Sequence, residues 1–227
     1  MSSHIISVPE YRNRTFLFKD RLHAGELLAT RLPSLDLDKT QLLAIPSGGV
    51  PVGYAVAKKL NIPLDVIVVR KIQIPWNTEA GFGAVAWDGT LAINESLVSA
   101  LSLSDQTVRQ CISQTEEVIR GRVRRFRGDK PKPSLEGKQV VLVDDGLASG
   151  FTMLVAVQSV KKRNPDKVVV AVPTGSESAV ELIAPSVNVL LCLNIRGGPL
   201  FAVADAYQNW YDLSDKEVIG LLKEFMV

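Results

Sequence analysis

Cysteine and histidine are scarce in this sequence. The 227 residues include two cysteines and two histidines, and the cysteines, Cys111 and Cys192, are too far apart to match a metal-binding spacing. Cys192 lies in an apolar, strand-like segment, which predicts a buried thiol. This use of cysteine favours a reducing compartment, and we expect a cytoplasmic protein.

An excess of charge and long apolar runs are equally missing. Lysine and arginine outnumber aspartate and glutamate by only 26 to 24, so composition gives no electrostatic reason to expect nucleic acid as a partner. No apolar run approaches the length of a membrane span, and the first ten residues lack the apolar core of a signal peptide. We therefore expect a single globular domain over residues 1–227 with no membrane partner.

The most informative stretch runs from Val140 to Met153 and reads Val-Val-Leu-Val-Asp-Asp-Gly-Leu-Ala-Ser-Gly-Phe-Thr-Met. Its four leading apolar residues predict a strand that is buried on both faces. Two adjacent acids and a glycine-rich turn follow, and the small and apolar residues after Met153 suit a helix. The predicted order is thus buried strand, acidic strand end, tight loop and helix.

The loop in this stretch has the chemistry to bind a phosphate. The first N–H groups of a helix have no partner inside the helix, and Gly146 and Gly150 allow backbone amides to approach an anion. Ser149 and Thr152 add hydroxyl donors. The loop has no lysine, which excludes a Walker A motif. Because adjacent carboxylates would repel a phosphate, they suit the diol of a ribose or a hydrated Mg²⁺ instead.

The stretch resembles the signature with which type I phosphoribosyltransferases bind phosphoribosyl pyrophosphate (PRPP). The resemblance implies that Asp144 and Asp145 bind the ribose hydroxyls. It also implies that the 5′-phosphate is bound by Gly146, Leu147, Ala148, Ser149, Gly150, Phe151 and Thr152. Ser149 is a departure, because the family more often has threonine there, but it keeps the hydroxyl. The alternative is a buried strand with an acidic helix cap, which does not need the whole motif.

A second glycine-rich turn, Pro46-Ser-Gly-Gly49, follows a strand predicted over residues 41–45 and precedes a helix predicted over about residues 50–60. In the family the corresponding loop binds pyrophosphate. The resemblance therefore implies this role for Ser47, Gly48 and Gly49, and a cis peptide bond between Pro46 and Ser47. On its own, the turn is equally compatible with a simple strand-to-helix connection.

Two cations, Arg70 and Lys71, follow the predicted strand Leu64–Val69. They are suited to bind the same pyrophosphate, and the alternative is a solvated strand end. From residue 71 to residue 104, glycine and proline interrupt the pattern and leave no clear helix. Such a segment in an α/β chain is usually a functional flap or lid, and the family has its mobile active-site loop at this place.

A long helix predicted from about Ser104 ends in an arginine-rich run, Arg120 to Arg127. Cations near the C-terminus of a helix complement its dipole. We therefore expect the run to be solvated, with RNA binding as the alternative.

The two ends of the chain complete the prediction. Residues 1–15 are expected to form a flexible arm, and an amphipathic helix is predicted between Phe18 and Leu32. Residues 194–227 are expected to form a C-terminal hood and a last helix, which begins with the capping box Ser214–Glu217. We expect the hood aromatics to pack this helix onto the core, with stacking on an acceptor as the alternative. They are Phe201, Tyr207, Trp210 and Tyr211.

Further strands predicted at residues 167–173 and 187–193, with a helix between them, continue the alternation of strand and helix. This alternation predicts an α/β fold: a parallel-sheet core with helices on both faces, plus the flap and the hood. Ligands bind such sheets at the carboxyl ends of the strands, where the strand order switches. Both glycine-rich loops and the Arg70–Lys71 pair fall at such ends, which predicts one shared site.

The resemblance extends over about residues 16–225 to uncharacterised, stand-alone phosphoribosyltransferase-like proteins of prokaryotes. It implies an enzyme of the pentosyl glycosyltransferase class that transfers a phosphoribosyl group from PRPP to an unidentified nitrogen nucleophile and releases pyrophosphate. The expected catalytic residues are Asp144, Asp145 and Lys71. Mg²⁺ is expected as the cofactor, held mainly by PRPP and water, with Asp144 or Asp145 as a further ligand. A homodimer is compatible with the resemblance.

The alternative function is regulatory. A protein of this kind would sense PRPP or a nucleotide with little catalysis and would bind RNA through the run from Arg120 to Arg127. A haloacid dehalogenase-like phosphatase is excluded, because its chemistry needs Asp-x-Asp, whereas Asp144 and Asp145 are adjacent.

Overall fold

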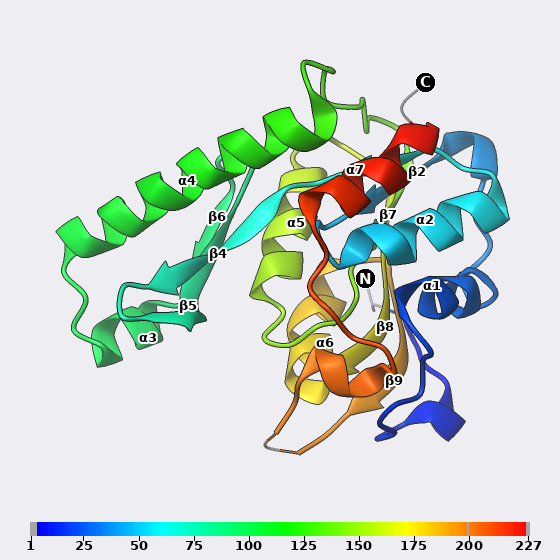
Figure 1. Ribbon diagram of the computed structural model, residues 1–227, viewed down its shortest axis with the longest axis horizontal. Coiled ribbons are helices and arrows are strands. Elements are labelled where there is room, and N and C mark those ends of the chain that lie inside the picture. Colours follow the sequence, from blue (N-terminus) through cyan, green and yellow to red (C-terminus); the bar gives the residue numbers. More distant parts are fainter. Residues whose placement is uncertain (1–3, 199, 226–227) are drawn as a thin grey trace.

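The computed structural model describes residues 4–198 and 200–225 of the chain. Its centre is a parallel sheet of six strands in the order β1-β9-β8-β7-β2-β3 (Figure 1). These strands are β1 (His4–Ile6), β2 (Thr40–Ala44), β3 (Leu64–Val66), β7 (Gln139–Val143), β8 (Lys167–Ser176) and β9 (Val189–Arg196). A three-stranded antiparallel sheet consists of β4 (Val69–Ile74), β5 (Asn77–Ala86) and β6 (Leu91–Ile93). The helices are α1 (Arg21–Ala29), α2 (Gly49–Leu60), α3 (Glu95–Ala100), α4 (Asp105–Arg127), α5 (Phe151–Lys161), α6 (Glu177–Ile183) and α7 (Asp215–Leu222).

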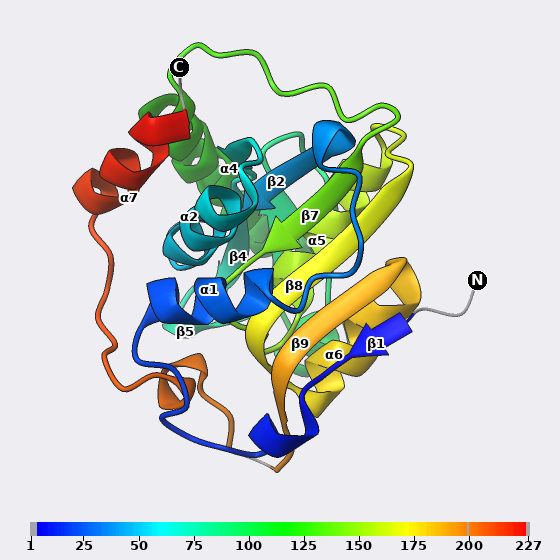
Figure 2. The same ribbon diagram turned by 90° about the vertical axis from the view of Figure 1, so that its right-hand side faces the viewer.

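The strands of the central sheet are buried on both faces. In β7, Val140 and Leu142 face one side while Val141 and Val143 face the other, and all four side chains are fully buried. Helices α1 and α2 cover one face, with α7 packed against α2, and α5 and α6 cover the other face (Figure 2). The predicted α/β fold, with a parallel core and helices on both faces, is confirmed.

Helices α1 and α2 pack closely because a glycine lies at their contact. A Cβ on Gly25 would lie only 2.4 Å from the carbonyl oxygen of Val52, so a larger residue would force the helices apart. The start of α1 is defined by Asp20, whose carboxylate accepts a hydrogen bond of 2.9 Å from the N–H of His23. This cap makes Arg21 the first residue of the helix and directs it toward the carboxyl edge of the sheet.

The chain leaves the central sheet earlier than the sequence indicates. The strand predicted over Leu64–Val69 is divided: β3 ends at Val66, and β4 begins at Val69 and pairs with β5 in the antiparallel sense. The division falls within Val66-Ile-Val-Val69, which is apolar throughout, and an apolar run does not show where a strand changes its partner. The division places Arg70 and Lys71 on β4, at the base of the flap.

The predicted flap is a folded unit that projects from the body of the molecule (Figure 1). It contains β4, β5 and β6, with α3 near its tip and α4 running along one side. It differs from the prediction in containing a helix, because α3 occupies Glu95–Ala100. Asn94 caps this helix by accepting a hydrogen bond of 3.0 Å from the N–H of Leu97. A helix of six residues is too short to show a periodicity in the sequence.

The N-terminal segment is tied to the central sheet through its backbone. β1 is an edge strand that pairs with β9, and the N–H of Val8 donates to the carbonyl of Leu193 at 3.2 Å. Residues 4–8 therefore differ from the loosely attached arm that composition suggested, while residues 1–3 lie outside the described part. Phe18, expected inside the first helix, instead precedes it and is buried against Tyr207, with ring centroids 5.7 Å apart.

The base of the flap is anchored by a buried ion pair. Arg127, at the end of α4, forms two hydrogen bonds of 2.8 Å with Asp65 of β3, and its side chain is only 3% exposed. The guanidinium also donates to the backbone carbonyls of Lys130 and Pro131. Such a bidentate arginine, with four of its five N–H donors paired, fixes α4 against the central sheet.

Replacing Arg127 with methionine should lower the free energy of unfolding by about 3–5 kcal/mol, because the Asp65 carboxylate would lose its partner. A matched control is Arg120→Met, which removes an exposed ion pair with Glu117 on the same helix and should cost less than about 1 kcal/mol. Denaturant unfolding of both variants measures the difference. Equal effects would show that the buried pair does not anchor the flap.

The flap should exchange its amide hydrogens faster than β7 in the ligand-free protein, most of all around the turn at residues 75–76 that joins β4 to β5. Register shifts interrupt the pairing of β4 with β5 on either side of Gln73, and Trp76 is 66% exposed. Little buried surface therefore holds this turn closed. Hydrogen exchange measured by mass spectrometry provides the test, and protection equal to that of β7 would contradict the prediction.

Candidate active site

Two loops meet where the central sheet switches its strand order. β2 and β7 are parallel neighbours, but the helices that follow them, α2 and α5, lie on opposite faces of the sheet (Figure 2). The connecting loops, residues 45–48 and residues 144–150, therefore diverge from one point at the carboxyl edge. This is the position at which α/β sheets of this type bind ligands.

The 45–48 loop and the 144–150 loop are in direct contact. A Cβ on Gly48 would lie 1.8 Å from Oδ2 of Asp145, and a Cβ on Gly49 would lie 2.8 Å from the carbonyl oxygen of Val143. Glycine is needed at these positions because the two loops approach so closely. The peptide bond between Pro46 and Ser47 is cis, as the resemblance implies.

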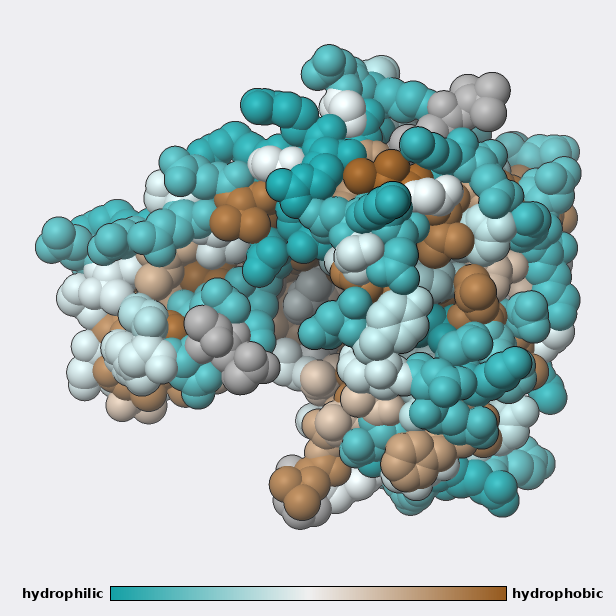
Figure 3. Space-filling model, in the orientation of Figure 1, coloured by the Kyte–Doolittle hydropathy of each residue, from teal (hydrophilic) through white to brown (hydrophobic). Residues whose placement is uncertain are grey.

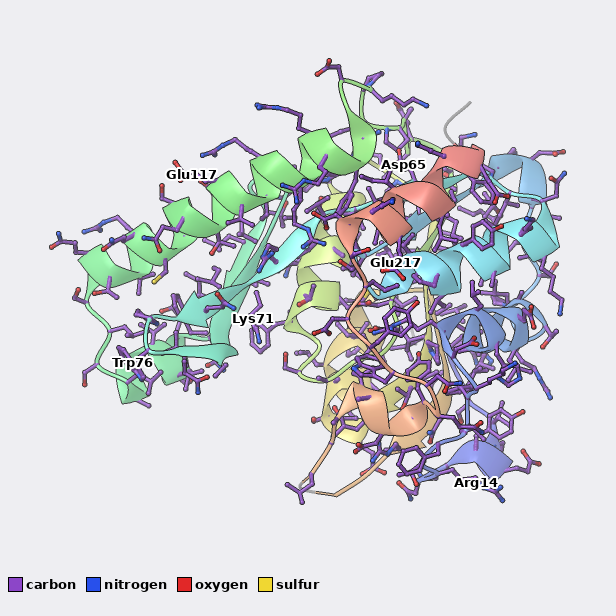
Figure 4. The ribbon with its side chains drawn as sticks, viewed as in Figure 1. Arg14, Asp65, Lys71, Trp76, Glu117 and Glu217 are labelled. Carbon is purple, nitrogen blue, oxygen red and sulfur yellow. The ribbon has the colours of Figure 1, made fainter. Side chains whose placement is uncertain are left out.

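A cavity of about 560 Å³ lies beside the 144–150 loop. The space-filling view shows a hollow between the flap and the body of the molecule (Figure 3), and the lining of the cavity comes from both parts. The predicted site residues in the lining are Lys71, Asp144, Gly146, Leu147, Ala148, Ser149, Gly150, Phe151 and Thr152. Figure 4 shows Lys71 where the flap faces the body. Gly48 and Gly49 face Asp145 and Asp144, and neither they nor Ser47 and Asp145 belong to the described lining of this cavity. Arg70 instead lines a second cavity of about 510 Å³ along α4, which Lys71 also reaches.

The 144–150 loop presents the open N-terminus of α5 to the cavity. Gly150 has φ 79°, a conformation that favours glycine, and no side chain caps the helix. The backbone of Leu147 is held by β8, since its N–H donates to Thr174 at 3.0 Å and its carbonyl accepts from the N–H of Ser176 at 2.9 Å. The loop thus holds the positive end of the helix dipole at a fixed position.

The two adjacent acids have different environments. Asp144 lines the cavity, and its Oδ1 accepts a hydrogen bond of 2.8 Å from the N–H of Asp145. Burial and the neighbouring charge of Asp145 raise the pKa of Asp144 well above its ordinary value. Asp145 instead forms an ion pair with Arg21, whose Nε lies 2.9 Å from Oδ2. Burial raises the pKa of Asp145, and the charge of Arg21 opposes that rise.

Arg21 joins Asp145 to the hood. Its Nη1 donates to the carbonyl of Tyr211 at 2.9 Å, and its guanidinium lies 3.8 Å from the centre of the Trp210 ring, within cation–π range. The hydroxyl of Tyr207 donates to the backbone carbonyl of Asp145 at 2.6 Å. Tyr207 is buried, so its role is packing, while Trp210 and Tyr211 are partly exposed.

The arginine-rich run at the end of α4 is not one solvated surface. Nη2 of Arg122 donates to Oγ of Ser47 at 2.8 Å, Arg127 is buried, and Arg125 pairs with Asp215 of α7. The expectation of solvated cations is therefore wrong for Arg122 and Arg127. The physical reason is that α4 packs against the flap sheet and α7 along this part of its length.

Arg21 and Arg122 contact residues of the candidate site, and the sequence alone did not single out either of them. Arg21 contacts Asp145 across 124 positions of sequence, and Arg122 contacts Ser47 across 75 positions. A local signal existed for Arg21 alone, because it follows Asp20, a residue type that caps helices, at the start of the first helix. Arg122 gave no such signal, because nothing in the run of arginines distinguishes the side chains that turn inward, Arg122 and Arg127, from the exposed ones.

Across residues 4–198 and 200–225, no group of three or more His, Cys, Asp and Glu side chains is arranged to hold a metal ion. Among the described residues that line the cavity, Asp144 is the one with a carboxylate side chain. None of the helices in this part of the chain is long and apolar enough to cross a membrane.

Comparison with known proteins agrees with this geometry. Residues 21–196 match the model of the phosphoribosyl transferase domain. Two curated proteins of Mycobacterium tuberculosis, each named provisionally as a phosphoribosyl transferase, are 38% identical over 207 residues, which make up 91% of this chain and 46% of each relative. The chain thus spans about half the length of the curated relatives it matches.

A solved structure is similar over nearly its whole length. The crystal structure of the protein TT1426 from Thermus thermophilus is 38% identical in sequence and superposes with a TM-score of 0.74, covering 92% of this chain and 98% of that one. The match to the family model covers most of the chain and includes both glycine-rich loops. By its sequence and its fold, the chain belongs to the phosphoribosyl transferase domain family.

Proposed function

We propose that this protein is a cytoplasmic phosphoribosyltransferase that transfers the phosphoribosyl group of PRPP to a nitrogen nucleophile and releases pyrophosphate. One observation carries the proposal: in a cavity of about 560 Å³, Asp144 lies beside the open N-terminus of α5. A ligand that has a phosphate next to a ribose diol satisfies both features at once. Membership of the family supports the same substrate class.

Each predicted site residue has a role in this proposal. The 5′-phosphate accepts hydrogen bonds from the backbone of the 144–150 loop and from the hydroxyls of Ser149 and Thr152, while Asp144 accepts from the ribose hydroxyls. Pyrophosphate binds near the 45–48 loop with Arg70 and Lys71. Asp145 acts indirectly, because its ion pair with Arg21 is already made in the free protein.

The residues around the leaving group carry the chemistry. The bond between C1 of the ribose and pyrophosphate breaks, and a lone pair of the acceptor nitrogen forms the new bond to C1. The surplus proton of the nitrogen then passes to water or to pyrophosphate. Positive charge develops on the sugar and negative charge on pyrophosphate. Cations held near the leaving group, Arg70 and Lys71, therefore lower the barrier. Holding both reactants in one cavity contributes the positioning effect.

Mg²⁺ fits this arrangement as an ion that is bound mainly through the substrate. It usually binds through one or two carboxylates together with substrate phosphates and several waters, and Asp144 is the acid in the described lining. Asp144 would then be its protein ligand, and the ion would neutralise charge on pyrophosphate. The donor set matches the expectation that PRPP and water hold most of its coordination shell.

An RNA-binding regulator has less support than the enzyme. The run from Arg120 to Arg127 was the feature that favoured it, and three of these arginines contact other parts of the protein. They are Arg122, Arg125 and Arg127. The surface left for a nucleic acid is correspondingly smaller, so we favour catalysis.

PRPP with Mg²⁺ should raise the melting temperature of the protein, since a ligand that binds only the folded state stabilises it by mass action. The gain is about 2.7 kcal/mol at a concentration of 100 Kd. Removing Mg²⁺ with a chelator should reduce the shift given by PRPP and leave the smaller shift given by ribose 5-phosphate. The measurement is thermal unfolding, and no shift at millimolar PRPP would count against the proposed function.

Asp144→Asn should weaken PRPP binding by about tenfold or more, because hydrogen bonds to a charged group are lost.

The Asp144→Asn change should also stabilise the free protein at neutral pH. Folding raises the pKa of Asp144 above its ordinary 3.8, so its ionised form disfavours the folded state at a pH above the raised pKa. This penalty fades as the pH falls toward 3.8. Calorimetric titration and unfolding against pH provide the test; unchanged affinity would remove the ribose role of Asp144.

Asp145→Asn should behave differently from Asp144→Asn. It removes the charged partner of Arg21, whose side chain is 8% exposed, and should lower the free energy of unfolding by about 3–5 kcal/mol. Denaturant unfolding of the two variants side by side measures the contrast. Equal stabilities would show that the ion pair with Arg21 does not hold this edge of the sheet.

A further inference from the structure

A cluster of cations lies on the side of the 45–48 loop that faces α4. Arg122 donates to Oγ of Ser47 at 2.8 Å, and the ring of Phe126, 4.9 Å from its guanidinium carbon, fixes its orientation. Burial, followed by the nearby charge of Arg70, lowers the pKa of Arg122. Asp215 offsets this only in part, because it is paired with Arg125.

Among the described side chains, neither Arg70 nor Arg122 has a carboxylate partner of its own. In the described part of the chain, none of the ion pairs includes either residue. Two guanidinium groups that repel each other and lack an acid between them form a site for an anion. Arg70 also lies on the strand that leads into the flap, so the pair spans the junction of flap and body.

Ser47 can pass this interaction on to a ligand. Because its oxygen accepts the hydrogen bond from Arg122, its own proton remains free to donate to an anion. Ser47 also stands just before α2, a helix of 12 residues with no side-chain cap, and therefore at the positive end of its dipole. A hydroxyl donor, a helix terminus and the Arg122 guanidinium thus gather at the 45–48 loop, and Arg70 is close enough to Arg122 for its charge to lower the pKa of that guanidinium.

We propose that Arg122 is a pyrophosphate-binding residue, which makes α4 a part of the substrate site. The inference rests on the proposed function, since it adds a residue to the site of the leaving group. A pyrophosphate between Arg70 and Arg122 replaces their repulsion with attraction and accepts the proton of Ser47. Arg122 comes from the helix that carries the flap, so the bound anion connects the flap to the 45–48 loop.

Calorimetric titration with pyrophosphate and Mg²⁺, with PRPP and Mg²⁺, and with ribose 5-phosphate tests the proposal. Arg122→Met should weaken the first two ligands by about tenfold or more, because a charge-assisted hydrogen bond is lost, and should leave the third nearly unchanged. Arg120→Met is the matched control, since Arg120 is exposed and paired with Glu117 on the same helix. It should change none of the three affinities.

Two further variants separate direct binding from support of the loop. Arg122→Lys keeps the charge, should recover part of the affinity for pyrophosphate, and replaces Arg122→Met should that variant fail to fold. Ser47→Ala removes the hydroxyl and should cost less affinity than Arg122→Met, with the double variant weaker than either. If Ser47→Ala and the double variant both matched Arg122→Met, Arg122 would only hold Ser47 in place, and the proposal would be overturned.

The outcomes also distinguish the two proposals. A wild-type protein that binds none of the three ligands would overturn the proposed function and this inference together. Wild-type binding with equal pyrophosphate affinities in Arg122→Met and Arg120→Met would overturn the inference alone. Selective loss of pyrophosphate and PRPP, with ribose 5-phosphate retained, would establish Arg122 in the site.

Discussion

The site depends on a contact that leaves no room for a side chain. Gly48 faces the Asp145 carboxylate, and a Cβ there would lie 1.8 Å from Oδ2. Because β2 and β7 are adjacent strands, this contact sets the separation of the two strand-to-helix loops. The same carboxylate is held by Arg21, which in turn contacts the hood. One close approach therefore places both loops, α1 and the hood in a single arrangement.

Charge at this edge of the sheet is only partly compensated within the protein. Asp144 is held where its ionised form is disfavoured, and Arg70 and Arg122 repel each other. A polyol or a cation next to Asp144 would stabilise its ionised form. An anion next to Arg70 and Arg122 would offset their repulsion. The free site is thus complementary to a ligand that carries both kinds of group, and this complementarity is built before the ligand arrives.

The parts of the structure that follow from local patterns could be predicted from the sequence. The buried strand β7, its loop and the start of α5 are encoded in 14 consecutive residues, Val140 to Met153, and the cis peptide at Ser47 followed from the resemblance. The division of β3 from β4 could not be predicted, because it depends on a change of pairing partner. Arg122 could not be recognised for a related reason, since its role arises from a contact across 75 positions.

The length of α4 gives its anchored end a mechanical significance. The helix has 23 residues and is therefore about 35 Å long, with its end clamped to β3 through Arg127 and its start near the tip of the flap (Figure 1). If the helix rotates about Arg127, Arg122 lies about 8 Å and Asp105 about 33 Å from the pivot. A swing of about 4 Å at the far end would move Arg122 by about 1 Å, which is enough to make or break a hydrogen bond. A rotation of this kind would therefore reduce a displacement of several ångströms at the flap tip to about 1 Å at Arg122, the range over which a guanidinium forms or loses a hydrogen bond to an anion.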